Sequence, residues 1–348
     1  MNARARVLVV DDQALYRAAI CRSLEEAPSL QVVGRAASGR EAIERIRELK
    51  PDLVTLDMEM PDMDGVAVLE ALAGMPGPRP RVVVFSAQSP AAAAATVRAL
   101  AMGAADFVLK PTAAEGAAAI TDRLVPRLVA LAPGVATATA SARPAAGPAP
   151  RPGLFTTRRR VVAIASSTGG PNALDEAVRS LPGSLPVPVL IAQHMPALFT
   201  ASLAERLDRI GRIRVVEARD GMPVQPGWAY LAPGDWHMTV QDSGGASVLR
   251  LNQGERVFNL RPAADVTFPT VARQFGPAVL AAVFTGMGCD GAVGCQAIHA
   301  AGGAVLTQSA ASCVVYGMPE AVDRAGITDL HFTPDTFGAA LSRFALAW

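Results

Sequence analysis

Carboxylates, a serine and a lysine recur in the first third of the chain, each directly after a short apolar run. They are Asp11, Asp12, Asp57, Ser86 and Lys110. Crowded carboxylates repel one another, and a hard divalent cation such as Mg2+ relieves that repulsion through oxygen ligands. Such a cation also neutralises an incoming phosphoryl group, to which the lysine adds positive charge and the serine a hydrogen bond. This set predicts phosphorylation of a carboxylate.

A second set of residues, later in the chain, has the types needed for acyl transfer through a serine. Ser167 stands in Ala-Ser-Ser-Thr-Gly-Gly, His194 in Ala-Gln-His-Met-Pro and Asp290 in Gly-Met-Gly-Cys-Asp-Gly. A serine hydroxyl becomes a nucleophile when a base takes its proton, and an acid must orient that base. A strand, a glycine-rich turn and a helix expose the serine at a sheet edge. A turn of this kind also suits phosphate binding or a purely structural role.

The chain has four histidines that could serve as the base. His194 ends an apolar run, and the rule that sites gather at strand ends favours it. His237, in a loop beside Trp236, is the alternative that the pattern leaves open. His299 falls within a helical pattern and His331 near the C-terminus, so both are expected to be structural.

The orienting acid is expected to be Asp290, because it also follows an apolar strand pattern. An aspartate at the start of a helical pattern fits a helix N-cap as well, and the two roles are compatible. Glycines on either side allow the backbone to approach a substrate, so the Met287 N–H can help to hold an oxyanion.

Alternating strand and helix patterns must position the first set, in residues 1–132. Strands are expected at Val7–Val10, Gln31–Arg35, Leu53–Leu56, Arg81–Phe85 and Asp106–Leu109. Amphipathic stretches such as Gly39–Lys50 lie between them, which predicts a parallel sheet with helices on both faces. Side chains that follow parallel strands meet at one edge of the sheet.

Residues 158–348 resume this alternation. Strands are expected at Val161–Ala165, Val187–Ala192 and Ala278–Phe284, and helices at Pro171–Leu181, Leu198–Ile210, Ala263–Phe275 and Asp290–Ala301. A small antiparallel insertion is expected from Trp228–Leu231, His237–Val240 and Ser247–Leu251, with Asp242-Ser243-Gly244-Gly245 as its turn. The predicted fold class is α/β, with two doubly wound, mainly parallel domains. Residues 133–157, rich in Ala and Pro, are expected to form a linker between them.

Composition excludes several classes of protein. Lys and Arg number 32 and Asp and Glu 31, and this balance does not favour binding to nucleic acid or to a membrane surface. The first apolar run ends after four residues in two aspartates, too short for the core of a signal peptide, and no apolar stretch is long enough to span a bilayer. We expect a cytoplasmic protein. The four cysteines show no metal-binding spacing.

The first 132 residues resemble the receiver domain of two-component response regulators. The matching stretches are Val-Val-Asp-Asp, Leu-Asp-Met-Glu-Met-Pro-Asp-Met-Asp-Gly, Phe-Ser-Ala and Leu-Lys-Pro-Thr. The resemblance implies a flavodoxin-like fold, with Asp57 as the phosphoacceptor and a cis bond before Pro111. The implied Mg2+ ligands are Asp11, Asp12, Asp57 and the backbone carbonyl of Glu59. The implied switch residues are Ser86, Phe107 and Lys110.

Over nearly its whole length the chain resembles the CheB family of chemotaxis protein-glutamate methylesterases. Matching stretches include Ser-Thr-Gly-Gly-Pro, Gln-His-Met-Pro, Tyr-Leu-Ala-Pro-Gly-Asp-Trp-His-Met, Phe-Thr-Gly-Met-Gly-Cys-Asp-Gly-Ala and Val-Val-Tyr-Gly-Met-Pro. The implied catalytic triad is Ser167, His194 and Asp290. The resemblance settles the choice of His194 over His237, and it implies the backbones of Thr168 and Met287 as oxyanion donors. Ser166 and Cys289 depart from the residues usual in the family.

This resemblance implies a serine hydrolase, activated by phosphorylation, that removes methyl groups from γ-glutamyl esters of chemotaxis receptors and deamidates glutamine there. It would reset receptor sensitivity during adaptation. A chemotaxis histidine kinase is the implied phosphodonor, and ester hydrolysis needs no cofactor. One rival is a module that only docks receptors. Another is a DNA-binding regulator, which needs a basic helix-turn-helix that residues 158–348 do not show.

Overall fold

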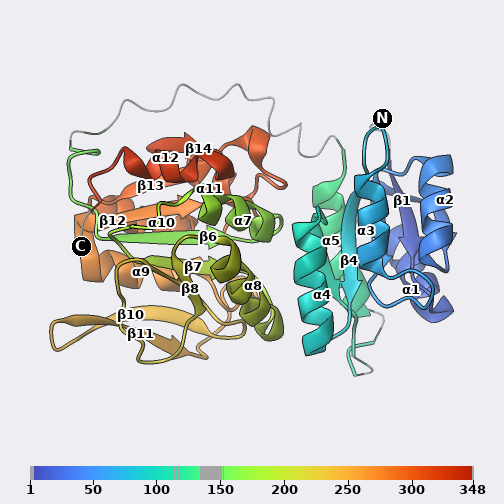
Figure 1. Cartoon of the computed structure of the whole chain (residues 1–348), viewed down its shortest axis with the longest axis horizontal. Coiled ribbons are helices and arrows are strands. Elements are labelled where there is room, and N and C mark those ends of the chain that lie inside the picture. The colour runs from blue at the N-terminus through green and yellow to red at the C-terminus, as the bar shows by residue number, and fades with distance from the viewer. Residues whose placement is uncertain (1–3, 113, 117, 134–150, 152, 347–348) are drawn as a thin grey trace. The chain divides into compact units, whose positions relative to one another are not determined.

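The computed structural model describes residues 4–112, 114–116, 118–133, 151 and 153–346. The chain divides into two compact units, Met1–Ser141 and Ala142–Trp348. Figure 1 shows that each unit has a sheet flanked by helices, so the α/β class expected from the sequence is confirmed. No helix in the described part of the chain is long and apolar enough to cross a bilayer.

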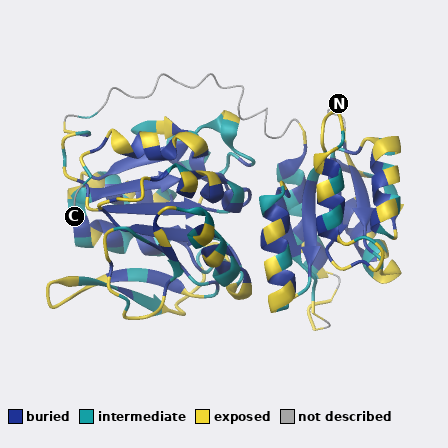
Figure 2. Ribbon diagram, viewed as in Figure 1, coloured by how far each residue is buried: buried dark blue, intermediate teal, exposed yellow. Residues whose placement is uncertain are grey.

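The first unit is a doubly wound sheet of five parallel strands. Its elements are β1 (Ala5–Val10), α1 (Ala14–Glu25), β2 (Leu30–Ala36), α2 (Gly39–Leu49), β3 (Leu53–Asp57), α3 (Gly65–Ala73), β4 (Arg81–Ser86), α4 (Pro90–Ala101), β5 (Asp106–Leu109) and α5 (Ala118–Leu131). The strand order is β2-β1-β3-β4-β5, the flavodoxin-like order. All five expected strands are present. The strands read as apolar runs because helices cover both faces, as the buried strands of Figure 2 show.

Side-chain caps begin three helices of this unit and so set where the strand-end loops stop. Ser38 accepts a hydrogen bond from the Glu41 amide at the start of α2, and Ser89 accepts one at the start of α4. Asp64 does the same for α3. Each cap satisfies an amide that the helix itself leaves without a partner, which fixes the helix start after the loop.

The second unit has a sheet of seven parallel strands and a separate hairpin. Its elements are β6 (Val161–Ser166), α7 (Gly170–Ser180), β7 (Val189–Gln193), α8 (Ala197–Ile210), β8 (Arg214–Glu217), β9 (Trp228–Leu231), β10 (His237–Ser243), β11 (Ala246–Asn252), α9 (Ala264–Phe275), β12 (Val279–Val283), α10 (Ala292–Ala300), β13 (Ala304–Gln308), α11 (Met318–Arg324), β14 (Leu330–Phe332) and α12 (Phe337–Ser342). The strand order is β14-β13-β12-β6-β7-β9-β8. One hydrophobic core joins this sheet to α9, α10 and the β10–β11 hairpin.

One strand was predicted in the wrong sheet. Trp228–Leu231, expected in the antiparallel insertion, is β9, which pairs in parallel with β7 and β8. Among the described strands, β10 pairs with β11 alone, through a two-residue turn in which Gly244 and Gly245 have φ of 64° and 88°. The prediction failed because no helix links β8 to β9. Their connecting loop instead touches β11, where Pro223 bridges Val248.

The end of the expected linker packs against the second unit. Residues 134–150 and 152 of that linker lie outside the described residues, but residues 151 and 153–157 are described. Arg151 donates to both carboxylate oxygens of Asp329, at 2.7 and 2.6 Å. Leu154 is 4% exposed, and the Phe155 ring centroid lies 5.2 Å from that of Phe344. Local composition gave no sign of these contacts because every partner lies far along the chain.

Candidate phosphoacceptor and catalytic sites

The first unit gathers its predicted acidic residues at the carboxyl edge of the sheet. Asp11 and Asp12 follow β1, and Asp57 ends β3. Each offers a carboxylate oxygen, and these atoms lie within 4.8 Å of one another. Lys110, which follows β5, places its Nζ 2.6 Å from Asp57 Oδ2 and 3.4 Å from Asp11 Oδ2. The parallel sheet therefore brings these four predicted residues together.

The electrostatics of this cluster favour an added positive charge. Burial and the nearby charge of Asp57 raise the pKa of Asp11 to about 6. Burial also raises the pKa of Asp57, although Lys110 opposes that shift. Asp12 Oδ1 is buried without a hydrogen-bond partner, and Asp11 Oδ2 has only the 3.4 Å ion pair with Lys110. Carboxylate oxygens with so few protein partners fit the oxygen ligands that Mg2+ prefers.

Lys110 is held in its charged form by these carboxylates. Burial alone would lower its pKa, but the hydrogen bond and charge of Asp57 raise it above the ordinary value. Its ammonium also lies 4.9 Å from the centre of the Tyr16 ring, a cation–π contact that the sequence did not predict.

The Glu59 amide donates to Asp57 Oδ1 at 3.2 Å, while metal binding by the Glu59 carbonyl stays a prediction. The expected cis bond before Pro111 is not found: the Lys110–Pro111 bond is trans, and the cis bond in the described residues is Arg261–Pro262.

The other two expected switch residues are buried. The Ser86 hydroxyl, fully buried, accepts a hydrogen bond of 2.7 Å from Thr96 of α4. Phe107 is 8% exposed. Ser86 would have to exchange the Thr96 hydroxyl for a phosphoryl oxygen in order to act in the switch. Thr96 carries no sequence signal for this contact, because alanines surround it in a helix.

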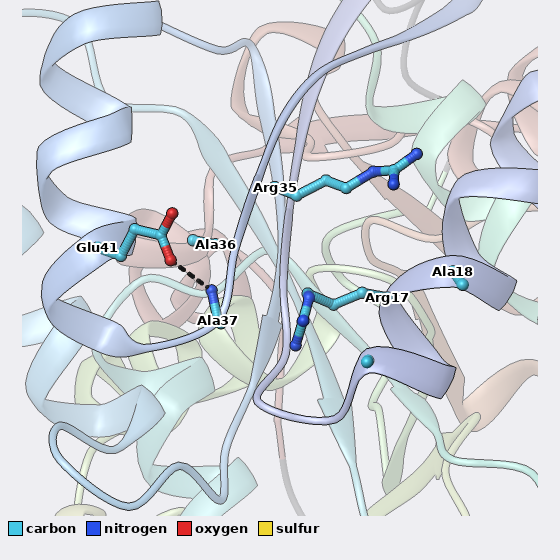
Figure 3. A pocket seen from close by; sticks show the side chains of 7 residues that line it. Arg17, Ala18, Arg35, Ala36, Ala37 and Glu41 are labelled. Carbon is cyan, nitrogen blue, oxygen red and sulfur yellow. Dashed lines mark hydrogen bonds between the residues drawn. The ribbon is translucent and has the colours of Figure 1, made fainter.

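The loop that carries Asp11 and Asp12 is supported by Arg17, which lines a hollow beside this edge of the sheet. Arg17, Arg35 and Glu41 line it together with small side chains of α1 and β2 (Figure 3). Arg17 Nη1 donates to the backbone carbonyls of Asp11 and Asp12, at 2.7 and 2.8 Å. The arginine thus fixes the backbone from which both carboxylates project.

In the second unit, strand register places the predicted nucleophile beside the predicted base. Ser166 pairs with Gln193 at the ends of β6 and β7, so Ser167 and His194 directly follow two adjacent strands. The His194 amide donates to the Ser166 carbonyl at 3.0 Å, which extends the pairing by one residue. Ser167 is half-buried. The carboxyl edge of the sheet therefore carries both side chains.

His194 is oriented by Asp290. Its Nε2 lies 2.7 Å from Asp290 Oδ2, and both side chains are buried. When Nε2 carries the proton and donates it to this bond, Nδ1 keeps a lone pair. That Nδ1 is buried and makes no hydrogen bond in the described structure, to Ser167 or to any other residue. It is the nitrogen available to take a proton from a neighbouring hydroxyl.

Asp290 is held in its ionised form. Burial alone would raise its pKa, but the hydrogen bond and charge of His194, together with two backbone amides, lower it below the ordinary value. Those amides belong to Ala264 and Asp265 in the first turn of α9, at 2.6 and 2.9 Å. The expectation that Asp290 caps the helix following it is therefore wrong: its carboxylate caps α9 and not α10. The helix dipole of α9 adds to the stabilisation of the negative charge.

Asp265, which the sequence did not single out, caps the other helix. Its Oδ1 accepts hydrogen bonds from the amides of Gly291 and Gly294 at the start of α10, at 2.9 and 2.7 Å. Its Oδ2 is buried without a partner. Burial and, to a lesser extent, the charge of Asp290 raise the pKa of Asp265 to about 6. The contacts join segments far apart in the chain, so the sequence carried no signal for them.

Gln193 was also missed, although it stands in the motif Gln-His-Met-Pro. Its Nε2 donates to the carbonyls of Ser167 and His194, at 3.0 and 3.2 Å. Its Oε1 accepts a hydrogen bond of 2.6 Å from Ser166. The buried amide thus fixes the backbones of the nucleophile and of the base, and the Ser166 hydroxyl is accommodated.

The loop after β12 approaches the nucleophile closely. A Cβ added at Gly286 would lie 2.8 Å from Ser167 Cβ, so only glycine allows this approach. The Ser167 amide donates to the Thr285 carbonyl at 3.1 Å, which fixes the two loops to each other. Met287 is the next residue after Gly286, and Thr168 the next after Ser167. The oxyanion roles of their amides stay predictions.

The remaining histidines lie elsewhere. His237 is 1% exposed and its Nε2 lies 2.9 Å from the Glu255 carbonyl, so it supports a loop and is not part of the His194–Asp290 pair. His299 is on α10. His331 Nδ1, on β14, lies 2.9 Å from the Thr307 hydroxyl. Of the cysteines, Cys289 is exposed beside Asp290.

A flavodoxin-like sheet with an acidic edge, followed by a parallel sheet with a Ser–His–Asp set at its edge, is the arrangement of a receiver joined to a serine hydrolase. Residues 7–121 match the response regulator receiver domain family, and residues 162–341 match the CheB methylesterase family. The chain therefore belongs to the CheB methylesterase family, as its motifs predicted.

Relatives of the same organisation extend over most of the chain. A protein-glutamate methylesterase/protein-glutamine glutaminase of Symbiobacterium thermophilum is 42% identical over 340 residues, covering 92% of this chain and 91% of that protein. Protein-glutamate methylesterase/protein-glutamine glutaminase 2 of Pseudomonas aeruginosa is 44% identical over 328 residues, covering 93% and 92%. The crystal structure of the Thermotoga maritima CheB methylesterase catalytic domain is 38% identical with a TM-score of 0.52, covering 53% of this chain and 98% of that one.

Proposed function

We propose that this protein is a protein-glutamate methylesterase that hydrolyses γ-glutamyl methyl esters of chemotaxis receptors, and that it also deamidates glutamine side chains there. The observation that carries the proposal is the 2.7 Å contact between His194 Nε2 and Asp290, which leaves Nδ1 as a free base at the strand end beside Ser167. The names of the relatives supply the substrate class. We place the reaction in the cytoplasm, where a receiver meets its kinase.

The proposed reaction is acyl transfer in two steps. Ser167 Oγ attacks the ester carbonyl carbon while its proton passes to His194 Nδ1, and the carbonyl oxygen becomes an oxyanion between the amides of Thr168 and Met287. Collapse breaks the bond to the methoxy oxygen, which takes the proton from His194 and leaves as methanol. Water then attacks the acyl-serine with the same base, releasing glutamate and restoring the hydroxyl. From glutamine, the leaving group is ammonia.

Methanol release from a methylated receptor fragment tests this proposal. The wild-type protein should release methanol in proportion to the enzyme added, and Ser167→Ala should release none above the uncatalysed rate. A folded wild-type protein without measurable methanol release would contradict the proposal and favour a module that only docks receptors.

We further propose that phosphorylation of Asp57 by a chemotaxis histidine kinase raises the hydrolase activity and so resets receptor sensitivity. Asp11, Asp12 and Asp57 would hold Mg2+, with the Glu59 carbonyl as a further ligand, and the bound ion would neutralise charge on the phosphoryl group. An activation of tenfold to a hundredfold needs roughly 1.4–2.8 kcal/mol of coupling. Methanol release with and without acetyl phosphate, in the wild type and in Asp57→Asn, tests this regulation.

A further inference from the structure

A strained aromatic residue is exposed at the tip of a loop in the second unit. Phe258 and Asn259 have φ of 51° and 61°, and the Val257 and Leu260 amides donate to each other's carbonyls at 3.2 and 2.8 Å. A two-residue turn of this kind favours Asn or Gly, whereas a bulky residue is strained there. Phe258 is 57% exposed, so burial does not offset the strain. Backbone strain that no packing contact offsets points to a functional role for the residue.

The base of this loop, residues 253–262, is firmly anchored. The buried His237 holds the Glu255 carbonyl through Nε2, at 2.9 Å. Asp235 Oδ1 accepts hydrogen bonds from Arg256 at 2.6 Å and from Arg261 at 2.8 Å. The Asp235 amide in turn donates to the Arg261 carbonyl at 2.9 Å. These contacts fix the direction in which the tip projects, as a binding element requires.

The loop leads directly into the catalytic machinery. The Ala264 amide, six residues after Phe258, donates to Asp290 Oδ2. A chain spans at most about 3.5 Å per residue, so Phe258 lies within roughly 20 Å of Asp290. A protein partner covers about 800 Å² on each side of an interface, a patch roughly 30 Å across. A protein substrate whose glutamate side chain reaches Ser167 is therefore large enough to contact the Phe258 tip as well.

Trp236 belongs to the same surface. It is 39% exposed and follows Asp235, which anchors the Phe258 loop. The backbone just before it packs on the start of α8, because a Cβ at Gly234 would meet the backbone of Ala197. The Gly234 amide also donates to the Thr200 hydroxyl at 3.0 Å. This loop thus contacts the helix that follows His194.

Five large apolar side chains in the described part of this unit are exposed, and three of them lie within four residues of His194 or Asp290 in the chain. They form what we call the apolar rim: Leu198, Trp236, Phe258, Met287 and Val293. Leu198 lies four residues after His194, and Met287 and Val293 lie three residues on either side of Asp290. Exposed apolar side chains of this size mark an interaction site, and the position of three of them close to His194 and Asp290 in the chain indicates a partner that reaches the catalytic residues.

We propose that Phe258 and Trp236 determine specificity by binding apolar side chains that flank the reacting glutamate in the protein substrate. The inference rests on the proposed function and adds the chemical character of the substrate surface. Such contacts strengthen binding before and during the reaction equally, so they lower KM without changing kcat.

The test compares two substrates of the full-length protein, a methylated receptor cytoplasmic fragment and the methyl ester of a capped single glutamate. Phe258→Ala should raise KM for the receptor fragment about tenfold with kcat unchanged, and it should leave kcat/KM for the small ester unchanged. Phe258→Leu is the matched control, since it keeps the strained backbone and the apolar contact, and its KM should stay near the wild-type value. Phe258→Gly should raise both KM and the melting temperature, because glycine relieves the strain.

Several outcomes would overturn the inference. Phe258→Ala could leave KM for the receptor fragment unchanged, or weaken both substrates equally, which would indicate a structural role. An increased rate on both substrates would mean that the receiver unit covers the rim, and a loss of self-association in sedimentation would mean that a second copy does. A wild-type protein inactive on both substrates would remove the proposed function itself, and the inference with it.

Discussion

Asp265 and Asp290 cap each other's helices. Asp290 accepts the first-turn amides of α9, at 2.6 and 2.9 Å, and Asp265 in that turn accepts two amides at the start of α10, which follows Asp290. The Asp290 oxygen that binds Ala264 also binds His194. The reciprocal caps therefore couple the direction of the catalytic acid to the junction of two helices.

We expect Asp265→Asn to lower kcat about tenfold with little change in KM, because the amide preserves one oxygen acceptor but removes the charge beside Asp290. Asp329→Asn is the matched control. Asp329 is also a buried carboxylate that accepts a backbone amide, from Val305 at 2.8 Å, but it lies at the opposite edge of the sheet. Equal kcat values for the two variants would contradict a positioning role for Asp265.

The same variant has a predicted effect on the pH dependence of stability. The folded pKa of Asp265 is raised to about 6 from 3.8, so its contribution to stability is complete below the unfolded value and is lost as the pH rises through the folded value. Asp265→Asn has no such group and should not lose this stability. The difference in free energy of unfolding, variant minus wild type, should therefore become more positive from about pH 4 to about pH 7 when measured by urea unfolding. A difference that does not vary with pH would count against the assignment.

The triad assignment predicts how single substitutions rank. Ser167→Ala and His194→Ala should each lower kcat by at least roughly a thousandfold, because the residues act as a unit. Asp290→Asn should retain more activity but lose stability, since it also caps α9. His237→Ala should keep hydrolysis of a small ester, because its ring supports the Phe258 loop. An inactive His237→Ala beside a fully active His194→Ala would make the choice of base wrong.

The carboxyl-edge residues could be predicted because parallel strands deliver them by topology alone. Apolar runs that end in Asp57 or His194 specify both the strand and the edge, and pairing of Ser166 with Gln193 then sets Ser167 beside His194. Residues that act through contacts distant in sequence could not be found this way. Asp265 accepts a hydrogen bond from Gly291, 26 residues later, at the start of α10, and Thr96 contacts Ser86 from inside an alanine-rich helix.

Errors in the fold prediction have the same origin. Trp228–Leu231 is a short strand pattern close in sequence to the hairpin strands, but tertiary pairing with β7 and β8 decided its sheet. Arg151 lies in a proline-rich segment whose composition predicts a linker, yet a carboxylate far along the chain holds it. In both cases a local pattern was outweighed by partners that become neighbours only in the folded chain.

The packed end of the linker predicts where a catalytic fragment should begin. A fragment that starts at Arg158 lacks the Arg151–Asp329 ion pair and the buried Leu154. A fragment that starts at Arg151 keeps both, and we expect it to be more stable by about 2 kcal/mol, mainly from the burial of one leucine. Urea unfolding of the two fragments measures the difference, and equal midpoints would show that these contacts contribute little.

Asp57 should be the only phosphorylated residue, and labelling should need Mg2+. Acetyl phosphate should label the wild type but not Asp57→Asn, the label should be released at alkaline pH as expected for an acyl phosphate, and EDTA should prevent incorporation. Label in Asp57→Asn would place the phosphoacceptor elsewhere.

Stabilisation of the receiver unit by Mg2+ should depend on pH in a defined direction. Burial and the charge of Asp57 raise the pKa of Asp11 to about 6, so without a cation the stability from this group is lost as the pH rises through that value. A divalent cation binds the ionised carboxylate and so restores the stability that ionisation removes. Mg2+ should therefore raise the melting temperature more at about pH 7.5 than at about pH 5, and Asp11→Asn should weaken that difference. Thermal unfolding with Mg2+ and with EDTA provides the measurement, and equal Mg2+ effects at the two pH values would show that Asp11 is not a ligand.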